Sequence, residues 1–273
     1  RLIVHADDFG IAEPVNLGIM EAHDRGIVTS VSLMATGPAF DHAVALAHTR
    51  PKLDVGVHLV LTEHRPLTGT SVPSLVGADG RFAPHVTRLA GKRLRGAASL
   101  DEVRMELDAQ IRRVRATGLA VSHLDGHQHV HVLPGIAGVV ADLAAAHGIA
   151  AVRYPAERVR AYMLRNPHYL KRVVEQVALT AACAVSPLRG LRRSDDFVGF
   201  YFGGRLDEAN LARVLAGLPA GRTVELMCHP GGEGMHADDW QYAWVAERDA
   251  LTSPRIRGLV EARSIELVSY RDV

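Results

Sequence analysis

Residues 122–132 read S-H-L-D-G-H-Q-H-V-H-V, and every second side chain in this stretch can hold a metal ion or a proton. Because alternate side chains of a β-strand point to opposite faces, an extended segment would place five of them on one face: His123, Asp125, His127, His129 and His131. Core packing does not require this pattern, whereas imidazole and carboxylate are the usual ligands of catalytic Zn²⁺ and related ions. The stretch therefore predicts a strand that runs into a hydrolytic metal centre. The alternative is a chance run in a chain with 15 histidines, of which a mononuclear site needs only one or two.

The segment before this stretch predicts a helix followed by a strand. Ser99 and Glu102 form a capping-box pattern, an apolar stripe with helical spacing follows them, and Gly118 ends the helix expected over 99–117. A strand is then expected over 119–125, and its last residues belong to the His-rich stretch. A strand that alternates with helices in this way is typical of a parallel sheet.

The same alternation of strands and helices continues along the whole chain. Strands are expected at 2–5, 28–34, 53–61, 119–125, 150–153, 197–202, 223–228 and 264–268. Helices are expected from Pro14 onward and at 41–48, 99–117, 136–147 and 208–218, with a further helical stretch before the last strand. This order predicts one α/β domain over residues 1–273, with helices outside a parallel sheet. We expect the sheet to close into a TIM-like (β/α) barrel rather than stay open.

The composition argues against several classes of protein. A formal net charge of +1 gives no sign of nucleic-acid binding. Cys183 and Cys228 lie far apart and form no C-x-x-C pair, which argues against a disulfide framework or a thiolate metal site. The sequence has no signal-peptide pattern and no apolar run of about 20 residues, so we expect a soluble cytoplasmic protein. The oligomeric state stays open.

Polar residues cluster where four of the expected strands end. Asp7 and Asp8 follow the first strand, and His58 lies near the end of the third. The 122–132 stretch runs past the fourth strand, and His229 follows the seventh. Catalytic groups of parallel α/β barrels lie at the carboxyl ends of the strands. We therefore interpret the four clusters as parts of one site.

Each cluster also has a purely structural interpretation. One of the adjacent carboxylates Asp7 and Asp8 could cap a helix, whereas in a metal site one is a ligand and the other takes a proton from water. His58 could be a hydrogen-bonded core histidine, although the nearby Gly56 indicates close approach of a ligand or of another backbone. His229, followed by Pro-Gly-Gly, is either an ordinary loop histidine or the donor of a proton to a leaving amine.

Two further segments do not fit the strand–helix alternation. Residues 62–85 form a long loop rich in Pro and Gly, for which we expect a role as a lid or in substrate binding. Residues 153–193 carry nine basic and two acidic side chains and an apolar stretch at 177–185. We interpret the region around 155–195 as a basic helical insertion. It is either solvated or rests as a peripheral contact on an anionic membrane surface.

Four short motifs resemble those of a known family, the YdjC-type (ChbG) carbohydrate deacetylases. They are A-D-D-F-G at 6–10, G-V-H-L at 56–59, H-L-D-G-H-Q at 123–128 and H-P-G at 229–231, in the family's order and across most of the chain. The resemblance implies a TIM-like, NodB-deacetylase-like barrel and metal-dependent removal of an N-acetyl group from a sugar. It implies one divalent cation, held by Asp8, His58 and His127. Asp7 would be the catalytic base and His229, less firmly, the acid.

The other polar residues of the 122–132 stretch receive secondary roles from the resemblance. Asp125 and His123 would orient ligands, whereas His129 and His131 would face the substrate or support the ligands. The stretch alone does not decide which of His127, His129 and His131 binds the metal, and the motif selects His127. Zn²⁺ suits this set of ligands best, with Mg²⁺, Co²⁺ and Ni²⁺ as alternatives.

Two further motifs are similar to the hopanoid-biosynthesis branch of the family, HpnK: S-L-M-A-T-G-P-A at 32–39 and A-V-R-Y-P-A-E at 151–157. This branch implies an N-acetylglucosamine-linked hopanoid as substrate, such as a derivative of bacteriohopanetetrol. The alternatives are a chitooligosaccharide such as diacetylchitobiose, and a different metal-dependent reaction, as in amidohydrolases and phosphoesterases. A sugar- or lipid-binding protein without activity is a further alternative, although binding alone needs no base such as Asp7.

Overall fold

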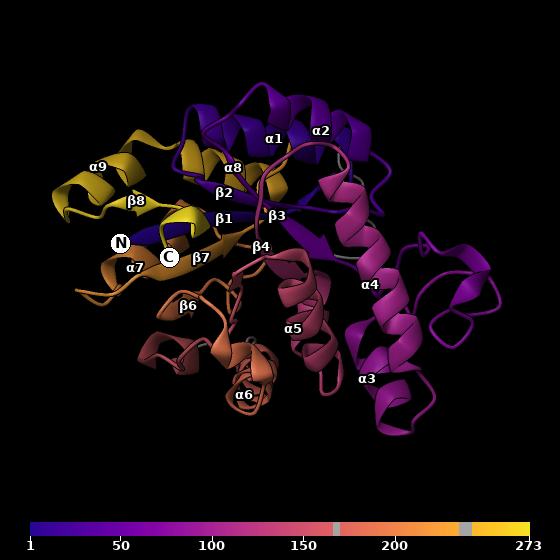
Figure 1. Ribbon diagram of the computed structural model, residues 1–273. Helices are drawn as coiled ribbons and strands as arrows, with labels where there is room; N and C mark the ends of the chain where they lie inside the picture. The colour runs from indigo at the N-terminus through magenta and orange to yellow at the C-terminus, as the bar shows by residue number, and fades with distance from the viewer. Residues whose placement is uncertain (166–169, 235–241) are drawn as a thin grey trace.

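A parallel β-sheet takes strands from the whole length of the chain (Figure 1). The computed structural model describes residues 1–165, 170–234 and 242–273. The strands are β1 (Leu2–Phe9), β2 (Ser30–Leu33), β3 (Asp54–Leu59), β4 (Val121–Gly126), β5 (Ala151–Val152), β6 (Asp196–Val198), β7 (Val224–Cys228) and β8 (Leu267–Val268). Their order in the sheet is β5-β4-β3-β2-β1-β7-β6, and β8 pairs with the start of β1. The prediction of a parallel α/β sheet is therefore confirmed.

The expected closed barrel is found only in part. The sheet curls, but among the described residues no ladder joins its end strands β5 and β6. Isolated parallel bridges, Ala151 to Arg192 and Glu157 to Phe197, lie between these two ends. β7 rather than β8 is the full neighbour of β1, since β8 pairs only with Leu2 and Ile3. The architecture is a curled, incompletely closed parallel sheet with helices outside.

The helices cover the outer surface of the curled sheet (Figure 1). They are α1 (Glu13–Asp24), α2 (Phe40–His48), α3 (Val86–Leu94), α4 (Leu100–Arg115), α5 (Ile136–His147), α6 (Leu170–Ala184), α7 (Glu208–Ala216), α8 (Trp244–Thr252) and α9 (Pro254–Ala262). α5 has the predicted bounds, and the Ser99 hydroxyl caps α4 by accepting a hydrogen bond from the Glu102 N–H at 3.4 Å. α3 was not expected from the sequence. α6 lies within the predicted insertion around 155–195, of which residues 166–169 are outside the described ranges.

Side chains alternate along the strands between an apolar outer face and a polar interior. On β1, Leu2, Val4 and Ala6 belong to the large core cluster, whereas His5 and Asp7 are buried polar side chains. β4 shows the same alternation, because Leu124 belongs to that core cluster and its neighbours His123 and Asp125 are buried and polar. The interior of a TIM barrel is filled mainly by branched apolar side chains. Here a network of buried charged and polar groups occupies the concave side of the sheet.

Most strands end one to four residues away from their predicted ends, and two of these differences, in β1 and β4, affect the polar residues. β1 continues through Asp7 and Asp8 to Phe9, so both aspartates lie within the strand and not after it. β4 stops at Gly126, and a short 3-10 segment, η2 (His127–Val132), follows with positive φ angles at Gln128 and His129. The prediction that five alternate side chains share one strand face was therefore wrong, because the backbone leaves the extended conformation after Gly126.

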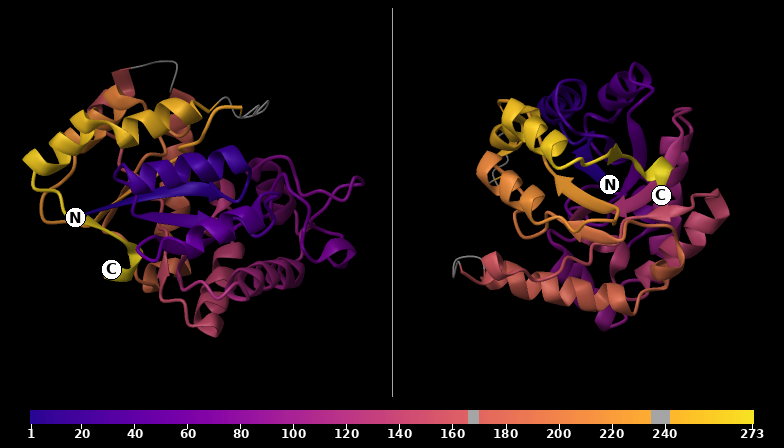
Figure 2. Two further views of the ribbon diagram at one scale, coloured as in Figure 1. Left: turned by 90° about the horizontal axis from the view of Figure 1, so that it is seen from above. Right: turned by 90° about the vertical axis from the view of Figure 1, so that its left-hand side faces the viewer.

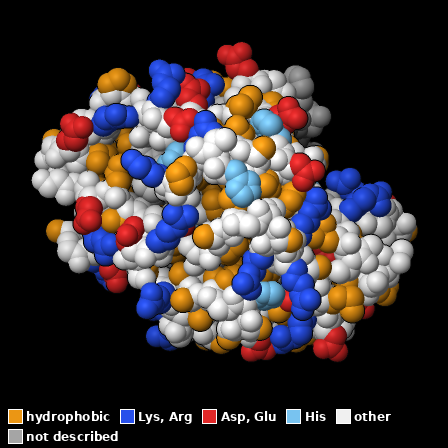
Figure 3. Space-filling model, turned by 45° about the horizontal axis from the view of Figure 1, so that its top comes forward, with side chains coloured by type: hydrophobic (Ala, Val, Ile, Leu, Met, Phe, Trp, Pro, Cys, Tyr) orange, Lys and Arg blue, Asp and Glu red, His pale blue; other side chains and the backbone are white. Residues whose placement is uncertain are grey.

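Both chain termini lie at the same end of the sheet, where β8 pairs with the start of β1 (Figure 2). On the face shown in Figure 3, Lys and Arg side chains are interspersed with acidic and apolar ones. Within the described ranges, no helix combines the length and the apolar character that crossing a bilayer would require.

Candidate active site

Two neighbouring carboxylates, Asp7 and Asp8, reach the same site because β1 is irregular at its end. In a regular strand, adjacent side chains would point to opposite faces. The pairing register with β2 shifts between Ala6 and Phe9, and Asp8 adopts a left-handed φ of 63°. Such a conformation costs a non-glycine residue of the order of 1–3 kcal/mol and is concentrated at functional sites. The bulge thus brings both carboxylates to the carboxyl edge of the sheet.

Asp8, His58 and His127 converge into one buried group, as the sequence motifs predict. The Asp8 Oδ1 atom lies 2.9 Å from Nδ1 of His127 and 3.3 Å from Nε2 of His58. Each residue offers one potential ligand atom, and these atoms lie within 4.8 Å of one another. One carboxylate and two imidazoles leave coordination positions open, which is the donor set of a catalytic rather than a structural zinc site.

Both histidines of this group have carboxylate partners on their second ring nitrogens. The Nδ1 atom of His58 lies 2.9 Å from Oδ1 of Asp125, and the Nε2 atom of His127 lies 3.0 Å from Oε2 of Glu63. Metal-binding imidazoles characteristically have such partners, which fix the tautomer and the orientation of the ring. The residues therefore fit a divalent cation, and Asp125 lies within hydrogen-bonding distance of the His58 ring that it was expected to orient.

The same carboxylates control the charges of the group. Burial alone would lower the pKa of His58, but Asp125 and Asp8 outweigh it and raise this pKa to about 10. Burial would raise the pKa of the Asp8 carboxyl, but His127 and His58 hold it below its usual range. The group therefore holds protons where a cation would compete for the same nitrogen and oxygen atoms.

Arg153 clamps the Asp7 carboxylate. Its Nη2 and Nη1 atoms each donate at 2.6 Å, to Oδ1 and Oδ2 of Asp7, and its Nε donates at 2.7 Å to Glu225. Burial would raise the pKa of Asp7, but Arg153 and His5 hold it well below its usual range. From the sequence, Arg153 was counted among the basic side chains of the 153–193 segment. That interpretation was wrong for Arg153, which is fully buried because it follows β5 directly and points into the curled sheet.

His229 follows β7 directly and lies near Asp7. Its Nε2 atom is 4.0 Å from Oδ2 of Asp7, and its backbone N–H donates to the buried Glu247 carboxylate at 2.6 Å. The Tyr242 ring packs beside the imidazole, with the ring centroids 4.8 Å apart. Asp7 and His229 can therefore act on the same substrate, one as an acceptor and the other as a donor of a proton.

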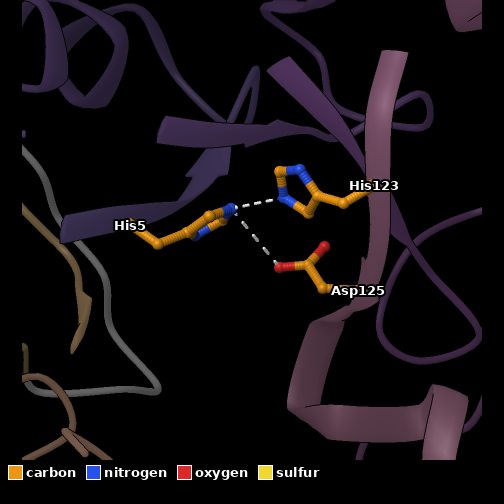
Figure 4. A group of neighbouring side chains, drawn as sticks. All are labelled: His5, His123 and Asp125. Atoms are coloured by element: carbon orange, nitrogen blue, oxygen red, sulfur yellow. Dashed lines mark hydrogen bonds and ion pairs between the residues drawn. The ribbon is translucent and has the colours of Figure 1, made fainter. Parts of the chain in front are cut away.

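A second group, made of His5, His123 and Asp125, resembles a metal site but is hydrogen-bonded (Figure 4). The Nε2 atoms of His5 and His123 are 2.8 Å apart, so one donates directly to the other and no cation fits between them. The Arg153 guanidinium lies 2.7 Å from His5 Nδ1 and 3.0 Å from Asp125 Oδ2, which adds a positive charge at the same place. Gly56 leaves room for the His123 ring, since a Cβ at Gly56 would lie 2.4 Å from His123 Nε2.

The remaining histidines of the 122–132 stretch are buried outside the Asp8 group. His131 Nε2 lies 3.1 Å from the Arg153 carbonyl oxygen, so this imidazole stabilises the backbone that presents Arg153. His129 packs against Phe197 and Phe200 and lines the cavity above the carboxylates. Of the three histidines that the sequence left open as ligands, the structure brings His127 to Asp8 and His58.

The YdjC-like protein family matches residues 1–262 of this chain. The chain belongs to this family. It is 36% identical over 302 residues to a carbohydrate deacetylase of Mus musculus, with 100% of this chain and 94% of the relative covered. It is 35% identical to a carbohydrate deacetylase of Geobacillus stearothermophilus, with 99% and 96% covered. A crystal structure from Enterococcus faecalis V583, of a protein named for cellobiose-phosphate cleavage, superposes with a TM-score of 0.79 at 27% identity, covering 99% and 97% of the two chains.

In this YdjC-like protein, a cavity of about 1090 Å³ lies above the two aspartates. The loop at 62–85 lines one side of it, as expected for a substrate-binding loop. The loop is fixed rather than free, because the Glu106 carboxylate accepts hydrogen bonds from the N–H groups of Leu67 and Thr68, and Glu102 accepts one from Ser74. These bonds to α4 argue against a lid that opens as a whole.

Another part of the cavity lining comes from the basic insertion and contains apolar side chains. It includes Val132 and Leu133 at the end of the His-rich stretch, and Ala178, Leu179 and Ala182 of α6, beside the charged Arg172 and Glu175 of the same helix. α6 is therefore part of the cavity wall in addition to being an outer helix. A cavity with a polar end at the carboxylates and an apolar side fits an amphiphilic ligand.

The polar network includes residues that were not predicted from the sequence as site residues, among them His5, Glu63, Arg153 and Glu225. Arg153 lies at the end of a predicted strand, and the motif residues lie at or just beyond such ends. This position is the signal that could have identified Arg153 as a site residue. Glu63 lies in the long loop and His5 and Glu225 lie within strands, where nothing in the local pattern separates them from ordinary polar residues.

Proposed function

We propose that this chain is a metal-dependent N-deacetylase that removes the acetyl group from an N-acetylglucosamine unit. One observation carries the proposal: a carboxylate held ionised by a buried arginine, Asp7, stands beside a group suited to a cation, Asp8 with His58 and His127. Hydrolysis of an amide needs both a proton acceptor for water and stabilisation of the oxyanion. Membership of a family with carbohydrate deacetylases among its members supports an acetamido sugar as the substrate.

Each residue of the site has a separate role in the hydrolysis of the amide. Asp8, His58 and His127 would hold a divalent cation, for which Zn²⁺ fits best, and this ion would supply polarisation of the amide carbonyl and a more acidic water. Asp7 takes the proton of the attacking water, and Arg153 keeps the Asp7 carboxylate oriented and charged beforehand. His229 gives a proton to the amine nitrogen as the C–N bond breaks. The products are acetate and a free amino sugar.

We further propose that the sugar is attached to a lipid, as in the N-acetylglucosamine-linked hopanoids of the HpnK branch. The apolar wall at Leu133 and Leu179 and the volume of the cavity support this, because a single sugar would fill only part of 1090 Å³. A rigid, apolar ring system attached to the sugar would gain contact with this wall. Such a substrate resides in a membrane, so we also propose peripheral membrane contact through the 153–193 segment.

The chemistry is tested by the Asp7→Asn variant, with Asp101→Asn on the exposed face of α4 as the matched control. The zinc-loaded wild type and the control should release acetate at similar rates. Asp7→Asn should bind zinc with unchanged stoichiometry and lose about 10²- to 10⁴-fold in turnover, the usual contribution of a general base. Turnover within tenfold of wild type would contradict the role of Asp7.

The substrate is tested by measuring acetate release from an N-acetylglucosaminyl hopanoid and from diacetylchitobiose in parallel. Faster turnover of the hopanoid supports the lipid-linked substrate. Faster turnover of diacetylchitobiose would retain the chemistry and make the protein a chitooligosaccharide deacetylase. No release from either, with zinc bound, would favour a different metal-dependent hydrolase or a binding protein.

A further inference from the structure

The outward face of α6 is almost without charge. Seven of its residues are exposed, and six of these are apolar: Leu170, Val174, Val177, Ala178, Ala181 and Ala184, with Lys171 as the exception. Ala178 lies at the border of this face, because it also lines the cavity. Val174 is 69% exposed and Val185, directly after the helix, is 82% exposed. On α4, by contrast, five of the six exposed residues within Leu100–Arg115 are charged and only Met105 is apolar. An exposed apolar stripe of this length is unusual on a solvated helix and indicates an interaction surface.

The orientation of α6 is fixed by polar contacts on its inner side. The side chains of Gln176 and Thr180 both donate to the Glu157 carbonyl oxygen, at 3.0 and 3.2 Å. Val173 and Cys183 on the same side are buried. Rotating the helix to hide the apolar stripe would break these hydrogen bonds and bury Lys171. The helix therefore keeps its polar anchors inward and its apolar side chains outward.

The segment that contains the stripe is rich in basic residues. Residues 158–193 contain eight Lys and Arg but a single acidic residue, Glu175, whose carboxylate lies 3.6 Å from the Lys171 amine. Arg158 and Lys171 are well exposed, with 65% and 88% of their side chains accessible. A symmetric dimer through this face would bring the basic surfaces of both copies together, which opposes self-association. An apolar stripe flanked by basic groups instead complements a bilayer with anionic headgroups.

We propose that the exposed stripe of α6 docks this protein on an anionic lipid bilayer. α6 forms an outer edge of the molecule, at the bottom of the right-hand view in Figure 2, so a flat surface can reach it. The inner flank of the same helix lines the cavity through Leu179 and Ala182. Docking therefore brings the cavity wall close to the membrane surface. Docking through this stripe deepens the membrane contact of the proposed function by naming the surface that makes it. Transfer of a lipid-linked sugar from the bilayer into the cavity rests on the proposed deacetylase activity, whereas docking does not.

The test is co-sedimentation with vesicles of phosphatidylcholine and phosphatidylglycerol, with pure phosphatidylcholine vesicles beside them. Wild type should bind the mixed vesicles, bind pure phosphatidylcholine weakly, and dissociate as salt is raised. The double variant Val174→Asp with Val177→Asp should bind at least about tenfold more weakly, because it loses apolar contact and adds charge repulsion. The double variant Leu94→Asp with Met105→Asp is the matched control, since it places the same two charges on exposed apolar sites of α3 and α4. It should bind as wild type does.

The outcomes separate docking on a bilayer from contact between copies of the chain. Failure of wild type to bind the mixed vesicles, or equal binding by the double variant, would overturn the proposal. A wild-type dimer in sedimentation velocity that the double variant abolishes, without vesicle binding, would make the stripe a contact between copies. Should the double aspartate variant not fold by circular dichroism, the pair Val174→Ser and Val177→Ser replaces it. Because co-sedimentation needs no turnover, its result does not depend on whether the protein deacetylates any substrate.

Discussion

Replacing Arg153 by methionine is the most direct test of the buried charge network. The substitution keeps much of the side-chain volume but leaves three buried carboxylates, of Asp7, Asp125 and Glu225, without their shared cation. Removing one partner of a buried ion pair typically costs about 3–5 kcal/mol. For a chain of this size, that loss corresponds to a decrease of about 6–20 °C in the unfolding midpoint. We expect a loss in this range at neutral pH, together with a loss of turnover.

The loss of stability in Arg153→Met should also depend on pH. The pKa of Asp7 is held well below its usual range, mainly because Arg153 outweighs burial, so this pairing stabilises the protein above the ordinary carboxyl pKa. In Arg153→Met the carboxyls of Asp7 and Asp125 lose this cation and bind protons at a higher pH than in wild type. The free energy of unfolding of wild type should therefore exceed that of Arg153→Met by the largest amount near pH 7, and this difference should become smaller as the pH falls toward about 4.

The assay is urea unfolding of wild type and variant at pH 7 and pH 5, followed by circular dichroism. Arg158→Met is the matched control, because Arg158 belongs to the same basic segment but is 65% exposed and lies 3.7 Å from its partner Asp196. Exposed pairs of this kind contribute about 0–1 kcal/mol. A change below about 1 kcal/mol for Arg153→Met, or an equal loss at both pH values, would refute the proposed role of the network.

Three further predictions follow from the packing and the charges. Gly56→Ala should lower the free energy of unfolding by about 1–3 kcal/mol in urea, because its Cβ would meet the His123 ring. The control is Gly138→Ala on α5, which should be neutral or stabilising because nothing lies within 4 Å of the added Cβ. Equal changes in the two variants would contradict the contact between Gly56 and His123. Burial raises the pKa of Glu157 to about 7, so its contribution to stability is complete below the unfolded-state pKa and is lost as the pH rises through 7. Wild type should therefore lose up to about 3 kcal/mol between pH 5 and 8 that Glu157→Gln does not lose, and parallel profiles would exclude this role. The pKa of His58 is raised to about 10, so zinc must displace at least one proton when it binds. The affinity of the protein for zinc should therefore rise about tenfold per pH unit between pH 6 and 8. Calorimetry that finds the same affinity at pH 6 and pH 8 would contradict this.

The sequence predicted those features whose signals are local. The Ser99 hydroxyl and the Glu102 backbone N–H lie three residues apart, so the cap of α4 follows from a short motif. The bounds of α5 follow from an apolar helical pattern that ends at a glycine. Polar residues at the ends of predicted strands correctly indicated that Asp8, His58 and His127 meet, because parallel strands bring their carboxyl ends to one edge.

Predictions failed where a local pattern had two structural solutions. Alternating histidines fit a strand, but a strand that ends at Gly126 and a left-handed turn at Gln128 and His129 fit the same letters. An arginine in a basic segment fits a solvated surface equally well, and the concave side of the sheet decided the position of Arg153. Sheet closure depends on pairing between the end strands β5 and β6, and the sequence of one strand does not identify which distant strand lies beside it.

What the sequence determined by itself is the alternation of strands and helices, the parallel sheet and the ligand types at its carboxyl edge. These follow from periods of two and 3.6 residues and from the chemistry of Asp and His. Tertiary structure alone decided which groups pair: Arg153 reaches Asp7 across 146 positions of the chain, and Glu63 reaches His127 across 64. The physical reason is that a buried charge must find a partner within about 3 Å, and only the folded sheet sets which distant residue is that close.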